Sequence, residues 1–124
     1  MKIKDCPFCH VDREILMENE FCFAIYDKYP VNKGHVLVIT RRHVGDYFDL
    51  GNNEVKAVWR MVGEVKHFLE EKFHPDGFNV GFNVGAVAGQ TVDHVHIHVI
   101  PRYRGDMEDP TGGVRHVIPE RGRY

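Results

Sequence analysis

The stretch TVDHVHIHVIPRY, residues 91–103, carries three histidines that alternate with apolar residues. His94, His96 and His98 are spaced by two residues, which is the side-chain period of a β-strand. The spacing predicts a strand that runs through about Ile100, where a proline follows, with all three imidazoles on one face. A half-buried strand usually carries a mixture of polar residues, so three identical titratable groups indicate chemistry.

Two kinds of chemistry fit these histidines. A His-x-His pair on a strand can hold a catalytic zinc with a third histidine, whereas a single imidazole can attack phosphorus as a nucleophile. The preceding loop, GAVAGQT (residues 85–91), supplies glycine N–H groups and neutral donors of the kind that bind phosphate. This loop favours phosphate chemistry. A zinc hydrolase with His94, His96 and His98 as ligands, and a nucleotide-binding regulatory module without turnover, remain alternatives.

A second motif, CPFC, lies near the N-terminus. Two thiolates at the spacing of Cys6 and Cys9 form half of a tetrahedral zinc site. A redox motif of this spelling belongs to a strand-to-helix turn in a βαβ unit, which the sequence does not indicate. His43 and His94 are the candidates for the other two ligands, and a pair of free thiols is the alternative. Cys22 alternates with apolar neighbours and is predicted to be a buried core thiol.

The rest of the sequence predicts an α+β domain. Residues 17–27, 35–40 and 77–85 alternate like strands, and residues 53–73 repeat apolar side chains at helical spacing. With the histidine strand, this order predicts an antiparallel sheet of about five strands with one long helix packed on it.

Finer expectations concern the helix and the C-terminus. Asn52 or Asn53 is expected to cap the helix, and Trp59 is expected to pack in the core. Residues 105–124, rich in Gly, Pro and Arg, are expected to form an extended tail over the surface or over a partner subunit.

Composition excludes several classes of protein. A chain of 124 residues with 43% hydrophobic and 27% charged residues suggests one globular domain. The net charge of −2, from 16 basic and 18 acidic residues, argues against a nucleic-acid partner. No run approaches the ~18 apolar residues that span a bilayer, and the first residues lack a signal-peptide core. With three cysteines, an odd number, the sequence predicts a cytoplasmic protein without a membrane partner.

Several motifs together resemble the histidine triad (HIT) superfamily. HVHIHVI at residues 94–100 looks like its signature, and PVNKGHVLVI at residues 30–39 resembles an earlier motif that carries a further active-site histidine. NVGAVAGQTV at residues 83–92 resembles the segment before the signature. The resemblance spans about residues 6–104 and looks closest to the fragile-histidine-triad branch, while the cysteine pair resembles bacterial members.

The resemblance implies a role for each matching residue. His96 would attack the α-phosphorus of an adenosine-type nucleotide and form a covalent nucleotidyl-histidine, and His98 would bind phosphate oxygens. His35 would orient the nucleophile, and Thr91 would pass a proton to the leaving oxygen. The expected substrate-binding residues are Asp27, Asn83, Gly89, Gln90 and His98; Asp27 would accept from ribose hydroxyls or, less favourably, face phosphate.

The resemblance also implies the metal and the assembly. A structural zinc, one per chain, would be held by Cys6, Cys9, His43 and His94, with no organic cofactor. Residues 1–104 would form a HIT domain including the zinc knuckle, residues 105–124 the tail, and the protein would be a homodimer. The substrate would be a dinucleoside polyphosphate or a nucleoside phosphoramidate, and hydrolysis and transfer to phosphate both stay open.

Overall fold

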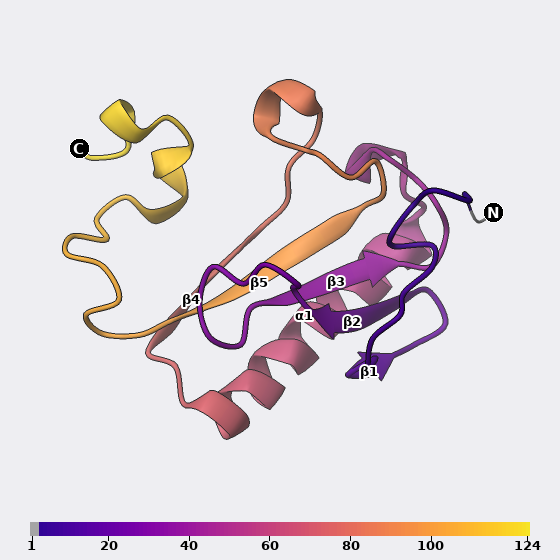
Figure 1. The fold of residues 1–124 in the computed structure, drawn as a ribbon, viewed down its shortest axis with the longest axis horizontal. Coiled ribbons are helices and arrows are strands. Elements are labelled where there is room, and N and C mark those ends of the chain that lie inside the picture. The colour runs from indigo at the N-terminus through magenta and orange to yellow at the C-terminus, as the bar shows by residue number, and fades with distance from the viewer. Residues whose placement is uncertain (1–2) are drawn as a thin grey trace.

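A computed structural model describes residues 3–124 of the chain. Five strands form one antiparallel sheet in the order β1-β2-β3-β5-β4 (Figure 1). One long helix, α1 (Asn52–Phe73), packs against β2, β3 and β5. The predicted α+β fold with about five strands and one long helix is therefore confirmed. The strands are β1 (Met17–Glu18), β2 (Cys22–Tyr26), β3 (Val36–Thr40), β4 (Gly77–Gly81) and β5 (His96–Arg102).

The main core lies between the sheet and α1. Alternate residues of β3 and β5, such as Val38 and Ile97, point toward the helix and are fully buried. Cys22 of β2 is fully buried on the same face, which confirms the predicted core thiol. The helix contributes an apolar stripe at a spacing of three and four residues, which is one face of a 3.6-residue helix: Val58, Met61, Val65 and Leu69.

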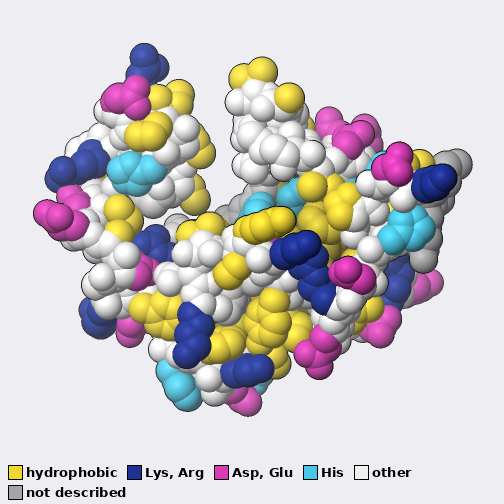
Figure 2. Space-filling view, in the orientation of Figure 1, with side chains coloured by type: hydrophobic (Ala, Val, Ile, Leu, Met, Phe, Trp, Pro, Cys, Tyr) yellow, Lys and Arg dark blue, Asp and Glu magenta, His cyan; other side chains and the backbone are white. Residues whose placement is uncertain are grey.

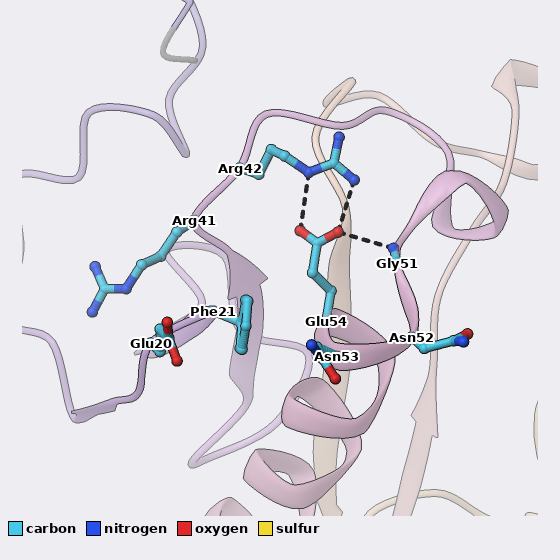
Figure 3. A pocket seen from close by; sticks show the side chains of 8 residues that line it. All are labelled: Glu20, Phe21, Arg41, Arg42, Gly51, Asn52, Asn53 and Glu54. Atoms are coloured by element: carbon cyan, nitrogen blue, oxygen red, sulfur yellow. Dashed lines mark hydrogen bonds and ion pairs between the residues drawn. The ribbon is translucent and has the colours of Figure 1, made fainter.

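The start of α1 differs from the sequence expectation by one residue. Gly51 is the N-cap, and Asn52 is already helical. Glu54 occupies the third helical position, where its Oε1 accepts from the Gly51 N–H at 3.0 Å. Arg42 donates to both oxygens of the same carboxylate, at 3.1 and 2.7 Å (Figure 3). The helix therefore begins without the expected asparagine cap, and a carboxylate reaches back to the N-cap amide instead.

Trp59 does not pack in the core as expected. It is 40% exposed, and its indole Nε1 donates to the Tyr47 hydroxyl at 2.9 Å. The buried stripe passes through Val58 and Met61, so that Trp59 is turned by about 100° away from it.

The expected first strand, residues 17–27, is divided into β1 and β2. The Asn19 side-chain oxygen accepts from the N–H groups of Phe21 and Cys22, at 2.8 and 2.9 Å. An asparagine that satisfies backbone donors in this way favours a turn over a continuous ladder. β1 and β2 therefore pair with each other as a tight antiparallel hairpin.

The histidine strand also has different bounds from those expected. β5 begins at His96, so that His94 lies in the preceding loop, and it continues through Pro101 to Arg102. The pairing of β5 with β3 ends at Val99. Beyond that residue only β4 pairs with β5, so a proline without an N–H leaves no gap in the β3 ladder. On the other side, β4 ends at Gly81, four residues earlier than predicted.

The C-terminal residues are less extended than predicted. They contain two short 3₁₀ helices, Gly113–Val117 and Pro119–Arg121. Arg115 holds this part together by donating to the Gly122 carbonyl at 3.0 Å. We call residues 109–124 the tail lobe; Figure 1 shows it in yellow, set apart from the strands. Among the described residues 3–124, no helix has the length and apolar character to cross a membrane.

Candidate active site and metal cluster

The two histidines of β5 project from the sheet face opposite α1. His96 pairs in register with Ile39 and His98 with Leu37. These two apolar side chains belong to a smaller core cluster against which Phe8 and Val11 of the N-terminal segment pack. His96 and His98 are each partly buried, with ring centroids 5.2 Å apart. The strand period thus places two of the three histidines side by side.

His96 is held with one nitrogen occupied. Its Nδ1 lies 2.7 Å from the carbonyl oxygen of His94. A carbonyl can only accept, so Nδ1 carries the hydrogen, and in the neutral imidazole Nε2 keeps its lone pair. The Phe8 ring meets the His96 ring edge-on at a centroid distance of 4.9 Å. Backbone and aromatic contacts together fix an imidazole whose free nitrogen is the nucleophilic one.

The tautomers of His35 and His98 follow from a backbone amide. The Val31 N–H donates to His35 Nδ1 at 3.0 Å, so the hydrogen of a neutral His35 is on Nε2. His35 Nε2 lies 3.0 Å from His98 Nδ1 and donates to it. The hydrogen of His98 is then on Nε2. This chain of donors presents His98 as an N–H donor, as the binding of a phosphate oxygen requires.

Burial keeps both of these imidazoles neutral. Desolvation lowers the pKa of His35, although the Asp27 carboxylate opposes the shift. Desolvation, with smaller contributions from His96 and His35, lowers the pKa of His98 to about 4. Asp27 Oδ2 lies 3.3 Å from His35 Nε2 and 4.0 Å from His98 Nδ1, and its Oδ1 accepts from the Tyr29 N–H at 2.8 Å. One anion therefore stands beside two neutral rings.

The depressed pKa of His98 predicts a pH-dependent stability. Above the ordinary pKa of 6.5 this imidazole is neutral in both states; between 6.5 and about 4 only the unfolded state is protonated. Protons therefore favour unfolding, and the free energy of unfolding is expected to lose about 3 kcal/mol across this window. Denaturant unfolding at pH values from about 7 to 4 should show a shallower fall for His98→Asn than for wild type.

A histidine on the helix surface provides the control. His67 lies exposed on the surface of α1, without the burial that acts on His98, so His67→Asn should keep the wild-type slope. Loss of a bound metal at low pH would affect all three proteins alike and cancels in the comparison. Equal slopes for wild type and His98→Asn would contradict the prediction.

Two clefts flank His98. The first, which we call the knuckle cleft, has a volume of about 500 Å³ and is lined by Pro7, Phe8, His10, Asp12, Arg13, Asp27, Lys28, Tyr29, Leu37, Thr91, Val92, His96 and His98. The second, the tail cleft, has a volume of about 490 Å³ and is lined by Asp27, Tyr29, Val31, His35, Asn79, Val80, Gly81, Phe82, Asn83, His98, Ile100, Val114 and Val117. Figure 2 shows a hollow in the surface between the tail lobe and the loop that contains the 3₁₀ turn Ala86–Ala88. Both volumes suit a small molecule, for which sites measure roughly 300–1,000 Å³.

The loop before the histidines carries the remaining predicted residues, and only some of them line a cleft. Thr91 lines the knuckle cleft and Asn83 the tail cleft. Gln90 instead holds the loop, since its amide donates to the Gly45 carbonyl at 2.8 Å and its oxygen accepts from the Gly85 N–H at 2.9 Å. Gly89 adopts φ +95°, which favours glycine at this turn. Gln90 and Gly89 thus shape the loop rather than line either cleft.

The N-terminal cysteines meet two histidines from distant parts of the chain. Cys6 Sγ lies 3.2 Å and Cys9 Sγ 3.6 Å from His94 Nδ1, and Cys9 Sγ lies 3.3 Å from His43 Nδ1. All four ligand atoms lie within 4.8 Å of one another. In a tetrahedral zinc site with usual bond lengths, sulfur and nitrogen ligands lie roughly 3.5 Å apart. The four residues therefore fit a metal ion.

The chemistry of His94 strengthens this fit. Its Nε2 lies 2.7 Å from the Thr40 carbonyl and must donate to it, which leaves the Nδ1 lone pair directed at the sulfurs. His94 thus has two separate contacts: its side chain joins the two cysteines and His43, and its carbonyl holds His96. In the described part of the chain, a second set of possible ligands is Asp27, His35 and His98. The alternative of one cage from His94, His96 and His98 has no such support.

A larger hollow, of about 610 Å³, lies at the start of α1 (Figure 3). It contains no histidine or cysteine, and its Arg42 and Glu54 neutralise each other. Arg41, which points away from that pair in the figure, contacts Glu18. This hollow therefore offers no histidine or cysteine nucleophile, and its two arginines are already paired with carboxylates.

The sequence did not indicate several residues that line these clefts. Phe8 lies within the cysteine motif, and the spacing of that motif indicated a metal site and no cleft. Val114 and Val117 lie in a segment where neither charge nor periodicity marks a site. The close spacing of Gly81 and Asn83 on one face of the expected strand was the available signal, because small and polar residues leave room beside a sheet.

Comparison with known proteins gives consistent matches to one family of proteins. The sequence pattern of the HIT domain matches residues 10–105. The bis(5'-adenosyl)-triphosphatase of Dictyostelium discoideum is 41% identical over 103 residues, covering 83% of this chain and 69% of that protein. The AP-4-A phosphorylase of Mycobacterium tuberculosis is 33% identical, covering 86% and 55%. A Zn-bound histidine triad family protein from Mycobacterium smegmatis superposes with a TM-score of 0.76 at 33% identity, covering 85% and 80%.

Proposed function

The chain belongs to the HIT domain family, and we propose that it is a nucleotide hydrolase or nucleotidyltransferase in which His96 attacks the α-phosphorus of an adenosine-type nucleotide. The observation that carries the proposal is the contact between His96 Nδ1 and the His94 carbonyl at 2.7 Å. It leaves the Nε2 lone pair on an imidazole that lines the knuckle cleft. A lone pair held in one orientation at a cleft is what nucleophilic attack on phosphorus requires.

The proposed reaction has two steps. His96 Nε2 forms a bond to the α-phosphorus while the bond to the bridging oxygen breaks, and that oxygen departs with the electron pair. The Nδ1–H donated to the His94 carbonyl stabilises the positive charge that develops on the ring. His98 Nε2–H donates to a phosphate oxygen. The Thr91 hydroxyl passes a proton to the leaving oxygen. Water or phosphate then attacks the phosphorus and releases His96.

The assignment of the remaining residues rests on their positions. Asp27 lines both clefts and would accept from ribose hydroxyls, and Asn83 would contact the leaving group. His35 acts through His98 by fixing its tautomer. Gln90 and Gly89 would support binding by holding the loop that carries Thr91. Residues 1–104 would form the catalytic domain, and residues 105–124 an addition that shapes the pocket.

The substrate class follows from the relatives' names. The Dictyostelium relative is named for a diadenosine triphosphate and the mycobacterial one for AP-4-A, which supports a dinucleoside polyphosphate for this chain. Profiling a panel of nucleotide polyphosphates and phosphoramidates tests the proposal. AMP released in water identifies a hydrolase, and incorporation of added inorganic phosphate into ADP, in place of AMP release, identifies a phosphorylase. No turnover on the panel would instead favour a binding module.

We propose in addition that Cys6, Cys9, His43 and His94 hold one structural zinc per chain. The Sγ–Nδ1 distances of 3.2–3.6 Å and the neutral, correctly directed His94 support this ligand set. Bound zinc would supply a rigid crosslink, and four protein ligands leave no position for substrate. Two cysteines used as metal ligands favour a reducing compartment such as the cytoplasm.

A homodimer is also proposed. β4 is an edge strand with one side unpaired in the described sheet, and edge strands are usually covered. Near it, Phe82 of the following segment stacks on Tyr47 at 4.2 Å, and Phe48 beside them is 74% exposed. An aromatic patch beside an open edge suits a second copy of the chain. Sedimentation at increasing protein concentration tests this, and a monomer at all concentrations would exclude it.

A further inference from the structure

The two clefts meet at His98 and differ in chemical character. His98, Asp27 and Tyr29 line both clefts, whereas His96 lines only the knuckle cleft. The knuckle cleft includes Arg13 and Lys28. The tail cleft contains no lysine or arginine among its lining residues, and Asp27 is its only carboxylate. A free phosphate chain would find no cation there.

The walls of the tail cleft suit a nucleobase. Most of its lining side chains are apolar, and two of them, Val114 and Val117 of the tail lobe, are 64% and 84% exposed. Asn79 and Asn83 add amide groups that can donate and accept. A cleft with apolar walls and a few polar groups is typical of sites for flat, partly polar ligands. The exposed valines would lose contact with water when such a ligand binds.

The direction of attack points from one cleft to the other. His96, His98 and Ile100 follow one another on the same face of β5, and the tail cleft lies at the Ile100 end. In a displacement at phosphorus, the nucleophile and the leaving oxygen lie roughly in line. With His96 at one end and the phosphorus beside His98, the leaving oxygen would lie where the two clefts meet, still in the cleft that Thr91 lines, and the rest of the leaving group would extend toward Ile100.

Gly81 makes the room for that group. It lies directly opposite His98 in the β4–β5 register and lines the tail cleft. A Cβ added at this position would meet no atom within 4 Å, and the backbone does not have a positive φ. A larger residue is therefore compatible with the fold, and its side chain would occupy the cleft.

We propose that the tail cleft holds the leaving nucleoside of a dinucleoside polyphosphate, and that Gly81 determines the preference for substrates with a nucleoside at both ends. The proposal rests on the function proposed above, in which His96 attacks phosphorus. For diadenosine triphosphate, the His96–phosphorus bond forms, the bond to the bridging oxygen breaks, and ADP leaves with the electron pair. Its adenosine would lie against Ile100 and the tail-lobe valines.

Gly81→Leu tests the proposal. The ratio of kcat/KM for diadenosine triphosphate to that for adenosine 5'-phosphoramidate, whose leaving group is ammonia, is expected to fall about tenfold or more, mainly through KM. Gly77→Leu is the matched control. Gly77 is the first residue of β4, has free space for a Cβ and lies outside the tail cleft. It should keep the wild-type ratio. An unchanged ratio in Gly81→Leu would overturn the proposal.

A binding measurement separates this proposal from the function on which it rests. In a His96→Asn background, calorimetry should show tighter binding of diadenosine triphosphate than of AMP, and Gly81→Leu should reduce that preference. If wild type turns over neither substrate but this preference exists, the proposed reaction fails and the cleft assignment stands. If AMP and the dinucleotide bind equally, the cleft assignment fails whatever the turnover.

Discussion

His96→Asn is expected to reduce kcat by at least about a thousandfold, since the loss of a covalent nucleophile commonly removes 10³- to 10⁶-fold. The imidazole is partly buried, is held by the His94 carbonyl and lines the knuckle cleft beside His98. Asparagine is smaller than histidine and uncharged, so the other residues that line the clefts should stay in place. Nucleotide binding should therefore survive while turnover is lost.

Steady-state kinetics with diadenosine triphosphate, together with calorimetric binding, measure the two effects separately. His67→Asn, on the exposed face of α1, is the matched control and should keep the wild-type kcat. Acid quenching during turnover by wild type should trap a nucleotidyl adduct on the peptide that contains His96. A His96→Asn enzyme that keeps more than about a tenth of wild-type kcat would contradict the nucleophile assignment.

Removal of the proposed zinc is expected to lower the free energy of unfolding by about 4 kcal/mol or more. The cluster joins Cys9 of the N-terminal segment to His43 and His94, which lie 34 and 85 positions further along the chain. Cys6 and Cys9 are buried, so without a metal they lose their main polar partner in the core. Protein purified without added metal should contain about one zinc per chain, and chelation should shift its unfolding midpoint downward.

Cys9→Ser provides the thermodynamic control for this experiment. The variant should already be destabilised, and a chelator should change its unfolding little, because the site is incomplete. In wild type, chelation should also make both thiols of the knuckle reactive toward alkylating reagents. Wild-type protein that contains no metal and unfolds identically with and without chelator would refute the site.

The same treatment separates a structural zinc from a catalytic one. Phe8, between the two cysteines, contacts the His96 ring, so loss of the knuckle should reduce activity by disordering the nucleophile. The fall in activity should then follow the same time course as thiol exposure. A catalytic metal would instead give immediate loss of activity with the knuckle still folded, and it would leave no adduct on His96.

The sequence predicted those elements whose periodicity is strong. α1 is right within one residue at its start, because its apolar spacing runs through five turns. The β-strand period correctly placed His96 and His98 on one face. Trp59 was placed in the core wrongly, because several apolar side chains extend the helix stripe sideways and the pattern does not show its centre.

Contacts between distant segments were harder to predict. Nothing in the spacing of Cys6 and Cys9 shows that His43 and His94 lie beside them; only the family resemblance suggested it. The division between β1 and β2 depends on how the Asn19 side chain points, and the form of the tail lobe on the carbonyls that Arg115 contacts. Such single hydrogen bonds leave no periodic trace in a sequence.

The tail lobe has its own set of polar contacts. Its own contacts hold it together, such as the ion pair between Arg123 and Asp109 and the contact of His116 with the Thr111 carbonyl. Its attachment is a short joint, where Asp106 accepts from Arg102 and Asn32. An engineer could therefore exchange the lobe beyond this joint for a different sequence and leave the histidines untouched. Exchange of the lobe could therefore match the same catalytic sheet to different leaving groups.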